Sequence, residues 1–150
     1  MSDTASIRVI VSLFREFELA ARDGGMSMPQ YRLLLFLRRG PRRAGELAAL
    51  AEVKKPSITP LIAAMDELGW IARAADEADR RSARLTLTSE GRAAMDAMET
   101  RLGAVLRRLV PADAQGEMDA AMKAIGGALM TTQEQRFQWV RDELVDAPFP

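Results

Sequence analysis

The feature that most constrains the fold of this chain is a pair of short helical patterns separated by a brief polar turn. Residues 44–51 are rich in alanine and leucine, and residues 56–68 carry apolar side chains at helical spacing. Gly69 supplies the residue type that commonly ends a helix. Two short helices joined by so tight a turn are typical of a helix-turn-helix unit.

Two short strands are predicted directly after these helices. Residues 70–73 form a short segment, and residues 83–88 alternate, with Leu85 and Leu87 on one face. The segment 74–82 between them is polar and charged, which predicts the exposed tip of a hairpin. Helices followed by such a hairpin have the order of a winged helix-turn-helix domain.

Longer helices are predicted on both sides of this unit. Apolar side chains recur every three or four residues over 4–22 and over 95–109, and Thr88 can cap the second of these helices. A further helical region follows Pro111. The helix expected from residue 29 is almost continuously apolar and should be central. The flanking seams could fold back on the domain, but seams of this length usually pair with a second chain. We therefore expect a homodimer.

The composition excludes several classes of chemistry. The 150 residues suit one domain, and they include no cysteine and no histidine. Thiol chemistry and histidine acid–base catalysis are therefore excluded, and most zinc, copper and haem sites lose their usual ligands. No apolar run approaches the roughly 20 residues of a membrane span, and the N-terminus does not resemble a signal peptide. We expect a cytoplasmic protein.

Charge is unevenly distributed along the chain although the net charge is zero. Residues 29–110 carry 15 basic and 10 acidic side chains, a net charge of +5. Residues 1–28 carry −1 and residues 111–150 carry −4. A basic centre between acidic flanks favours contact with nucleic acid, although ordinary scatter would also produce a segment of +5.

The segment 45–91 closely resembles the MarR family of winged helix-turn-helix transcription regulators. The matching landmarks, in order, are Glu46-Leu47-Ala48, Leu68-Gly69, Arg73, Asp79-Arg80-Arg81 and Leu87-Thr88-x-x-Gly91. The resemblance implies one domain over 1–150, mainly α with a small β-hairpin. Within it, the winged helix-turn-helix would span about 29–92, with dimerisation helices over 4–22 and 93–145. It also implies a homodimer that binds double-stranded DNA with no cofactor and no metal.

The family resemblance places candidate DNA contacts on the second helix of the motif. Its N-terminal half would enter the major groove and present Lys54, Lys55, Ser57 and Thr59. Lysines can contact phosphates or guanine, and hydroxyls can contact bases or phosphates. Ser57 and Thr59 could instead merely satisfy the start of the helix. Pro60 removes one backbone hydrogen bond inside this helix.

Arginines supply the other candidate DNA contacts. The resemblance assigns Arg81 of the wing to the minor groove and Asp79 to its support, with Arg80 and Arg84 beside them. Arg42 and Arg43 precede the first helix of the motif and could hold the phosphate backbone. The alternative interpretation of the wing arginines is a solvated run of charge.

A small aromatic or anionic effector is implied by the resemblance, between the dimerisation helices and the DNA-binding part. The candidate contacts are Arg15, Tyr31 and Trp70. For Tyr31 and Trp70, a place in the ordinary hydrophobic core is the favoured interpretation.

Three functions are weighed for the chain. The leading one is a ligand-responsive repressor acting as a homodimer on a pseudo-palindromic operator. The alternative is a winged-helix protein-interaction module without specific DNA binding. An enzyme using Asp76, Glu77 and Asp79 is disfavoured, because these carboxylates fall on an exposed hairpin with no pocket to raise a pKa.

Overall fold

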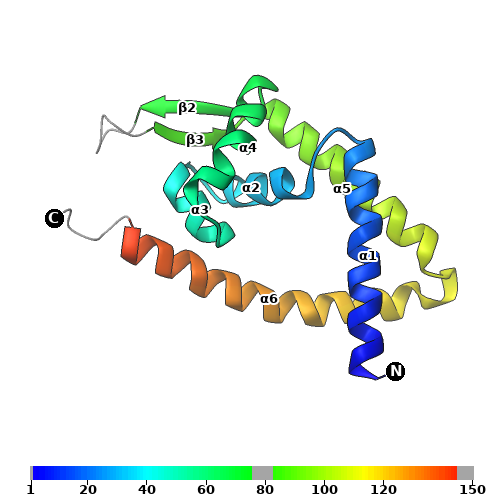
Figure 1. Cartoon of the computed structure of the whole chain (residues 1–150). Helices are drawn as coiled ribbons and strands as arrows, with labels where there is room; N and C mark the ends of the chain where they lie inside the picture. The colour runs from blue at the N-terminus through cyan, green and yellow to red at the C-terminus, as the bar shows by residue number, and fades with distance from the viewer. Residues whose placement is uncertain (1, 76–82, 145–150) are drawn as a thin grey trace.

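A computed structural model describes residues 2–75 and 83–144 of the chain (Figure 1). The helices are α1 (Asp3–Asp23), α2 (Met28–Arg38), α3 (Ala44–Ala51), α4 (Lys55–Glu67), α5 (Ser89–Leu109) and α6 (Gln115–Leu144), with one 3-10 turn (Ala112–Ala114) before α6. The strands are β1 (Arg42–Arg43), β2 (Ile71–Ala75) and β3 (Ala83–Leu87). The fold is mainly helical with a small antiparallel sheet, as the sequence predicts. Among the described residues, no helix is both long enough and apolar enough to cross a membrane.

Side-chain caps fix where the predicted helices begin. Ser27 forms a capping box with Gln30 at the start of α2: the Gln30 amide donates to Ser27 Oγ, and the Ser27 amide donates to Gln30 Oε1. Thr88 caps α5, since its Oγ1 accepts a hydrogen bond of 3.0 Å from the Gly91 amide. Helix α5 begins directly after the expected cap, and α2 begins one residue before the expected residue 29.

The sheet has three strands, which corrects the expectation of a two-stranded hairpin. The order is β1-β3-β2, and both pairings are antiparallel. Arg42 lies opposite Leu85, and Ile71 lies opposite Leu87. The two residues of β1 are both arginines, so they show no apolar alternation, and their strand geometry depends entirely on pairing with the distant β3.

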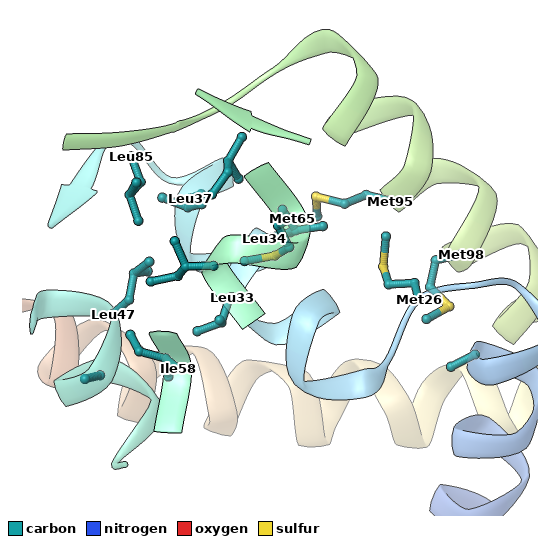
Figure 2. Packing of buried hydrophobic residues seen from close by; sticks show 14 of the residues in the cluster. Met26, Leu33, Leu34, Leu37, Leu47, Ile58, Met65, Leu85, Met95 and Met98 are labelled. Atoms are coloured by element: carbon teal, nitrogen blue, oxygen red, sulfur yellow. The ribbon is translucent and has the colours of Figure 1, made fainter. Parts of the chain in front are cut away.

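The hydrophobic core lies where α2 meets its neighbours, which confirms the expected central position of this helix. Leu33, Leu34 and Leu37 of α2 are buried, and α2 contacts α1, α3, α4, α5 and β3. Figure 2 shows these leucines converging with Met65 and Leu85, while methionines extend the cluster toward α5 and α1. Burying such side chains contributes about 1.5–3 kcal/mol each.

The long helices lead away from this core and return to it. In Figure 1, α5 leaves the sheet, the chain turns after Leu109, and α6 runs back until its C-terminal end lies near α3. Helix α1 packs along α5. We call residues 28–75 and 83–91 the winged-helix lobe.

Candidate nucleic-acid interface

The turn between α3 and α4 is compact because one residue adopts a left-handed conformation. Glu52 has φ 56° and ψ 42°, a region that non-glycine residues seldom occupy. Its conformation lets the Val53 amide return to the Ala48 carbonyl at 3.0 Å. The chain therefore enters α4 after only three residues, as the sequence pattern predicts.

Helix α4 divides its side chains between the core and solvent. Ile58, Ile62 and Met65 are buried and seat the helix on the lobe. The predicted DNA contacts lie on the N-terminal part of the helix and at its cap, and all are exposed: Lys54, Lys55, Ser57 and Thr59. This arrangement leaves a positively charged, hydroxyl-bearing surface open on a rigidly seated helix.

The Thr59 hydroxyl is already engaged within α4. It donates a hydrogen bond of 3.1 Å to the carbonyl of Lys55, four residues earlier. Its oxygen remains an acceptor for an outside donor. Pro60 lies next to it, and the helix continues past Pro60. Because the hydroxyl proton is committed, Thr59 is suited to accept from a base amino group rather than to donate to a phosphate.

A set of contacts anchors the C-terminal end of α4. Arg73 Nε of β2 lies 2.7 Å from Asp66 Oδ2. The Thr88 hydroxyl donates to the Gly69 carbonyl at 2.6 Å, and the Thr88 amide donates to the Trp70 carbonyl at 3.1 Å. Thr88 therefore joins the end of α4 to the start of α5. This connection holds α4, with its exposed lysines and hydroxyls, in a fixed orientation on the lobe.

The three described candidate arginines of the sheet lie on β1 and β3. Arg43 and Arg84 are register partners across the two strands. The Arg43 amide donates to Glu46 Oε2 at 2.6 Å, so the buried Glu46 caps the start of α3. The Arg42 guanidinium lies 5.4 Å from the ring centroid of Phe137 in α6. The predicted wing residues Asp79, Arg80 and Arg81 fall outside the described residues.

The candidate effector contacts lie in different surroundings. Arg15 pairs with Glu18 at 3.5 Å and lines a hollow of about 420 Å³ between the end of α1 and the start of α2. Trp70 is partly buried and packs against the hydrophobic core. In the part of the chain that the structure describes, no hydrogen bond or ion pair joins Arg15, Tyr31 and Trp70 to one another.

Tyr31 also packs against the core but carries a polar link to α5. Its hydroxyl donates to Glu99 Oε1 at 3.1 Å, and Arg38 Nη1 lies 3.4 Å from the same oxygen. Burial, followed by the negative charge of Glu99, raises the pKa of Tyr31 to about 12. Tyr31 therefore serves as a hydrogen-bond donor that ties α2 to α5.

Sequence reasoning missed the contacts between the end of α6 and the lobe. Phe137 meets Phe36 edge to face, with ring centroids 5.8 Å apart, and Arg39 pairs with Glu134 at 2.6 Å. The only signal in the sequence was the return of apolar side chains at Phe137 and Val140 after a polar stretch. That signal does not identify which residues Phe137 and Glu134 contact, because those residues lie about 95 positions earlier in the chain.

Comparison with known proteins agrees with this geometry. Residues 24–82 match the model of the MarR family. A search of curated proteins finds no match. Among solved structures, YusO from Bacillus subtilis is 22% identical with a TM-score of 0.68, over 85% of this chain and 92% of that one.

Two further solved structures share the fold. Wild-type MarR from E. coli is 18% identical with a TM-score of 0.70, over 83% of this chain and 96% of that one. The transcriptional repressor CouR, solved bound to a 23-mer DNA duplex, is 23% identical with a TM-score of 0.67, over 86% of this chain and 92% of that one. The matched segment contains α2, β1, α3, α4 and β2, the elements that form the helix-turn-helix and its first wing strand. Over residues 24–82, the chain is therefore similar to the MarR family.

Proposed function

We propose that this protein is a sequence-specific DNA-binding transcription regulator that acts as a homodimer and represses its target genes until an effector binds. The observation that best supports the proposal is that α4 buries one face in the core and exposes polar side chains on the other. Its inner face is buried on the lobe, while Lys54, Lys55, Ser57 and Thr59 are all exposed together. A helix seated in this way can enter the major groove without rearranging the core.

The charges around α4 support contact with the phosphate backbone as well as with bases. Lys54 and Lys55 would neutralise phosphates on the strand that borders the groove. Ser57 and Thr59 offer hydroxyls for base edges. Arg81 of the wing would enter the adjacent minor groove, with Asp79 as its support, and Arg80 and Arg84 would contact the flanking phosphates.

Homodimerisation is supported by apolar side chains that the chain leaves exposed on its outer helices. Their exposed fractions lie between 38 and 64%. They are Ile7, Val9, Ile10, Val11, Phe14 and Leu19 on α1, and Met122, Ile125, Leu129 and Met130 on α6. Such a concentration of exposed aliphatic side chains on two helices favours pairing with a second copy. A symmetric pair would place two α4 helices about 34 Å apart on a pseudo-palindromic operator.

Control by a ligand is the remaining part of the proposal. CouR has been solved both with a DNA duplex and with p-coumaroyl-CoA, which shows that this fold can accommodate either partner in a related protein. Here, an aromatic or anionic effector near Arg15, Tyr31 and Trp70 would change the spacing between the lobes and so weaken DNA binding.

The test is a mobility-shift titration with the DNA that flanks the gene, at two salt concentrations and with random-sequence competitor. We expect competitor-resistant binding that weakens steeply with salt. Lys55→Ala should weaken binding and reduce the salt slope by about 1, because one phosphate contact is lost. Lys123→Ala is the matched control, since Lys123 is an exposed lysine on α6.

Two results would contradict the proposal. One is equal loss of affinity in Lys55→Ala and Lys123→Ala, which would place no contact on α4. The other is the absence of specific binding both to this DNA and to any sequence selected from a random pool. That second result would favour the winged-helix protein-interaction module.

A further inference from the structure

The exposed side of α4 has an apolar centre over the part that the proposed function places in the major groove. The buried side chains of α4 all lie on the opposite side of the helix. At about 3.6 residues per turn, the positions farthest from them are Pro56, Pro60, Ala63 and Glu67, and all four are exposed. The first three carry no hydrogen-bonding group on the side chain. The lysines and hydroxyls of α4 therefore flank a central apolar strip.

The position of Pro60 is not explained by the stability of the helix. Pro56 lies in the first turn, where a missing amide hydrogen costs little because that amide has no helical partner. Pro60 lies one turn further in, and its ring nitrogen cannot donate to the Pro56 carbonyl. Packing in the core could offset this loss, but Pro60 is exposed. Pro60 therefore destabilises α4 at a place where a ligand in contact with the helix would meet its ring.

A shallow, open hollow of about 410 Å³ lies at this place. It is lined by Lys55, Pro56, Thr59 and Pro60. The two prolines are separated by about 6 Å along the helix axis. Lys55 adds its aliphatic stem, which lets the ammonium group reach beyond the hollow. The Thr59 hydroxyl donates to the Lys55 carbonyl at 3.1 Å. Apart from the ammonium group, the lining side chains therefore offer hydrocarbon and no free donor.

Among the bases, thymine has the major-groove edge that fits this lining. Its C5 methyl group is the only methyl group that the standard base pairs present there. A methyl group gains by leaving water for hydrocarbon, whereas a donor or acceptor placed against hydrocarbon loses its hydrogen bonds to water. The paired adenine presents an amino donor, which the Thr59 oxygen can accept. Lys54 and Lys55 supply the positive charge that the phosphates beside the groove require.

We propose that the hollow lined by Lys55, Pro56, Thr59 and Pro60, here called the proline hollow, receives the C5 methyl group of a thymine in the major groove of double-stranded DNA. This inference rests on the proposed function and adds to it the base that α4 selects. Ring closure fixes the backbone φ of each proline, so the hollow has its shape before DNA binds. One thymine in each half-site of the operator is therefore specified by its methyl group.

The experiment compares DNA duplexes that differ by a single methyl group. A duplex that the full-length protein selects from a random pool is prepared with thymine and, one position at a time, with deoxyuridine, which lacks only the C5 methyl group. The affinity for each duplex is measured by mobility shift. At one thymine of each half-site, uracil should lower the affinity about fourfold, the ratio for burying one methyl-sized group.

The combined substitution Pro56→Ala and Pro60→Ala tests whether the proline hollow causes this preference. It removes both rings, and alanine favours the helix, so α4 should remain folded. This variant should bind the thymine and uracil duplexes with equal affinity. Leu68→Ala is the matched control, because Leu68 is an exposed apolar side chain at the opposite end of α4. The control should keep the fourfold preference.

A second measurement uses the wild-type protein alone and so does not depend on the folding of a variant. At the same position, the thymine–adenine pair is replaced by cytosine–guanine or by 5-methylcytosine–guanine. The methylated pair should bind about fourfold more tightly than the unmethylated one, because the two differ only in the group that enters the hollow. A uracil effect without this methylcytosine effect would overturn the inference, since it would attribute the preference to the shape of the DNA.

The outcomes distinguish this inference from the proposed function. Specific binding with equal affinity for thymine and uracil at every position would overturn the inference and leave the proposed function standing. A thymine preference that persists when both prolines are replaced would do the same. If the protein selects no duplex from the random pool, the proposed function fails and the inference fails with it.

Discussion

Gly91→Ala is the substitution that best tests how the lobe is assembled. A Cβ atom at position 91 would lie 2.1 Å from the carbonyl oxygen of Trp70 and 2.7 Å from Cδ1 of Leu87. The first of these is a backbone atom, so no side-chain rotation can relieve the contact. The loop after α4 and the start of α5 would have to separate by about 1 Å to reach an ordinary carbon–oxygen distance.

The cost follows from the contacts that this separation would break. Overpacking costs about 1–3 kcal/mol, the Thr88 cap on Gly91 contributes about 1 kcal/mol, and the hydrogen bond from the Thr88 amide to Trp70 contributes about 1 kcal/mol. Alanine recovers about 1 kcal/mol of helix propensity. The net destabilisation is about 2–4 kcal/mol, a large share of the 5–15 kcal/mol that typically stabilises a domain.

Urea unfolding followed by far-ultraviolet circular dichroism measures this loss at matched protein concentration. Gly103→Ala is the control in the same helix, because its Cβ would meet only the guanidinium of Arg107, at 3.2 Å. Gly103→Ala should change the free energy of unfolding by less than about 1 kcal/mol. Equal effects of the two substitutions would refute the close approach of α5 to the loop after α4.

Three other predictions each concern one side chain. Tyr31 is the only tyrosine, so tyrosinate absorbance should report its pKa of about 12, and Glu99→Gln should lower it. Since an unfolded tyrosine ionises at about 10, the contribution of Tyr31 to stability should fall as pH rises from about 10 to about 12. Asp66→Asn breaks a half-exposed ion pair with Arg73, so urea unfolding should show a loss of no more than about 1 kcal/mol. Ile125→Glu places a charge on the exposed apolar face of α6 and should convert a dimer to a folded monomer in sedimentation equilibrium, whereas an unchanged mass would exclude this face from the interface.

The sequence predicts the helices of this fold well because each carries its own signals. The capping box at Ser27 and the cap at Thr88 are local, and they fix the starts of α2 and α5. Strand β1 carries no such signal. Arg42 and Arg43 form a strand only because β3 lies beside them, and pairing between segments some 40 residues apart is not encoded in local periodicity.

The candidate site divides in the same way. Exposure of Lys54, Lys55, Ser57 and Thr59 could be predicted because their positions are opposite the apolar face of one helix. The position of Arg42 could not be predicted, since its ring partner comes from the far end of α6. Long-range contacts of charged side chains depend on the tertiary arrangement. The local sequence around an arginine that precedes a helix does not reveal which distant group it contacts.

Selection of binding sites from a pool of random double-stranded DNA tests the central claim most directly. If two α4 surfaces of a dimer read DNA, the selected sequences should form a pseudo-palindrome whose half-sites are one helical turn apart, about 34 Å. Combined Lys55→Ala and Ser57→Ala substitution should abolish that enrichment while the dimer persists. Recovery of no enriched sequence, or equal enrichment by this variant, would contradict the assignment of α4 as the surface that reads DNA.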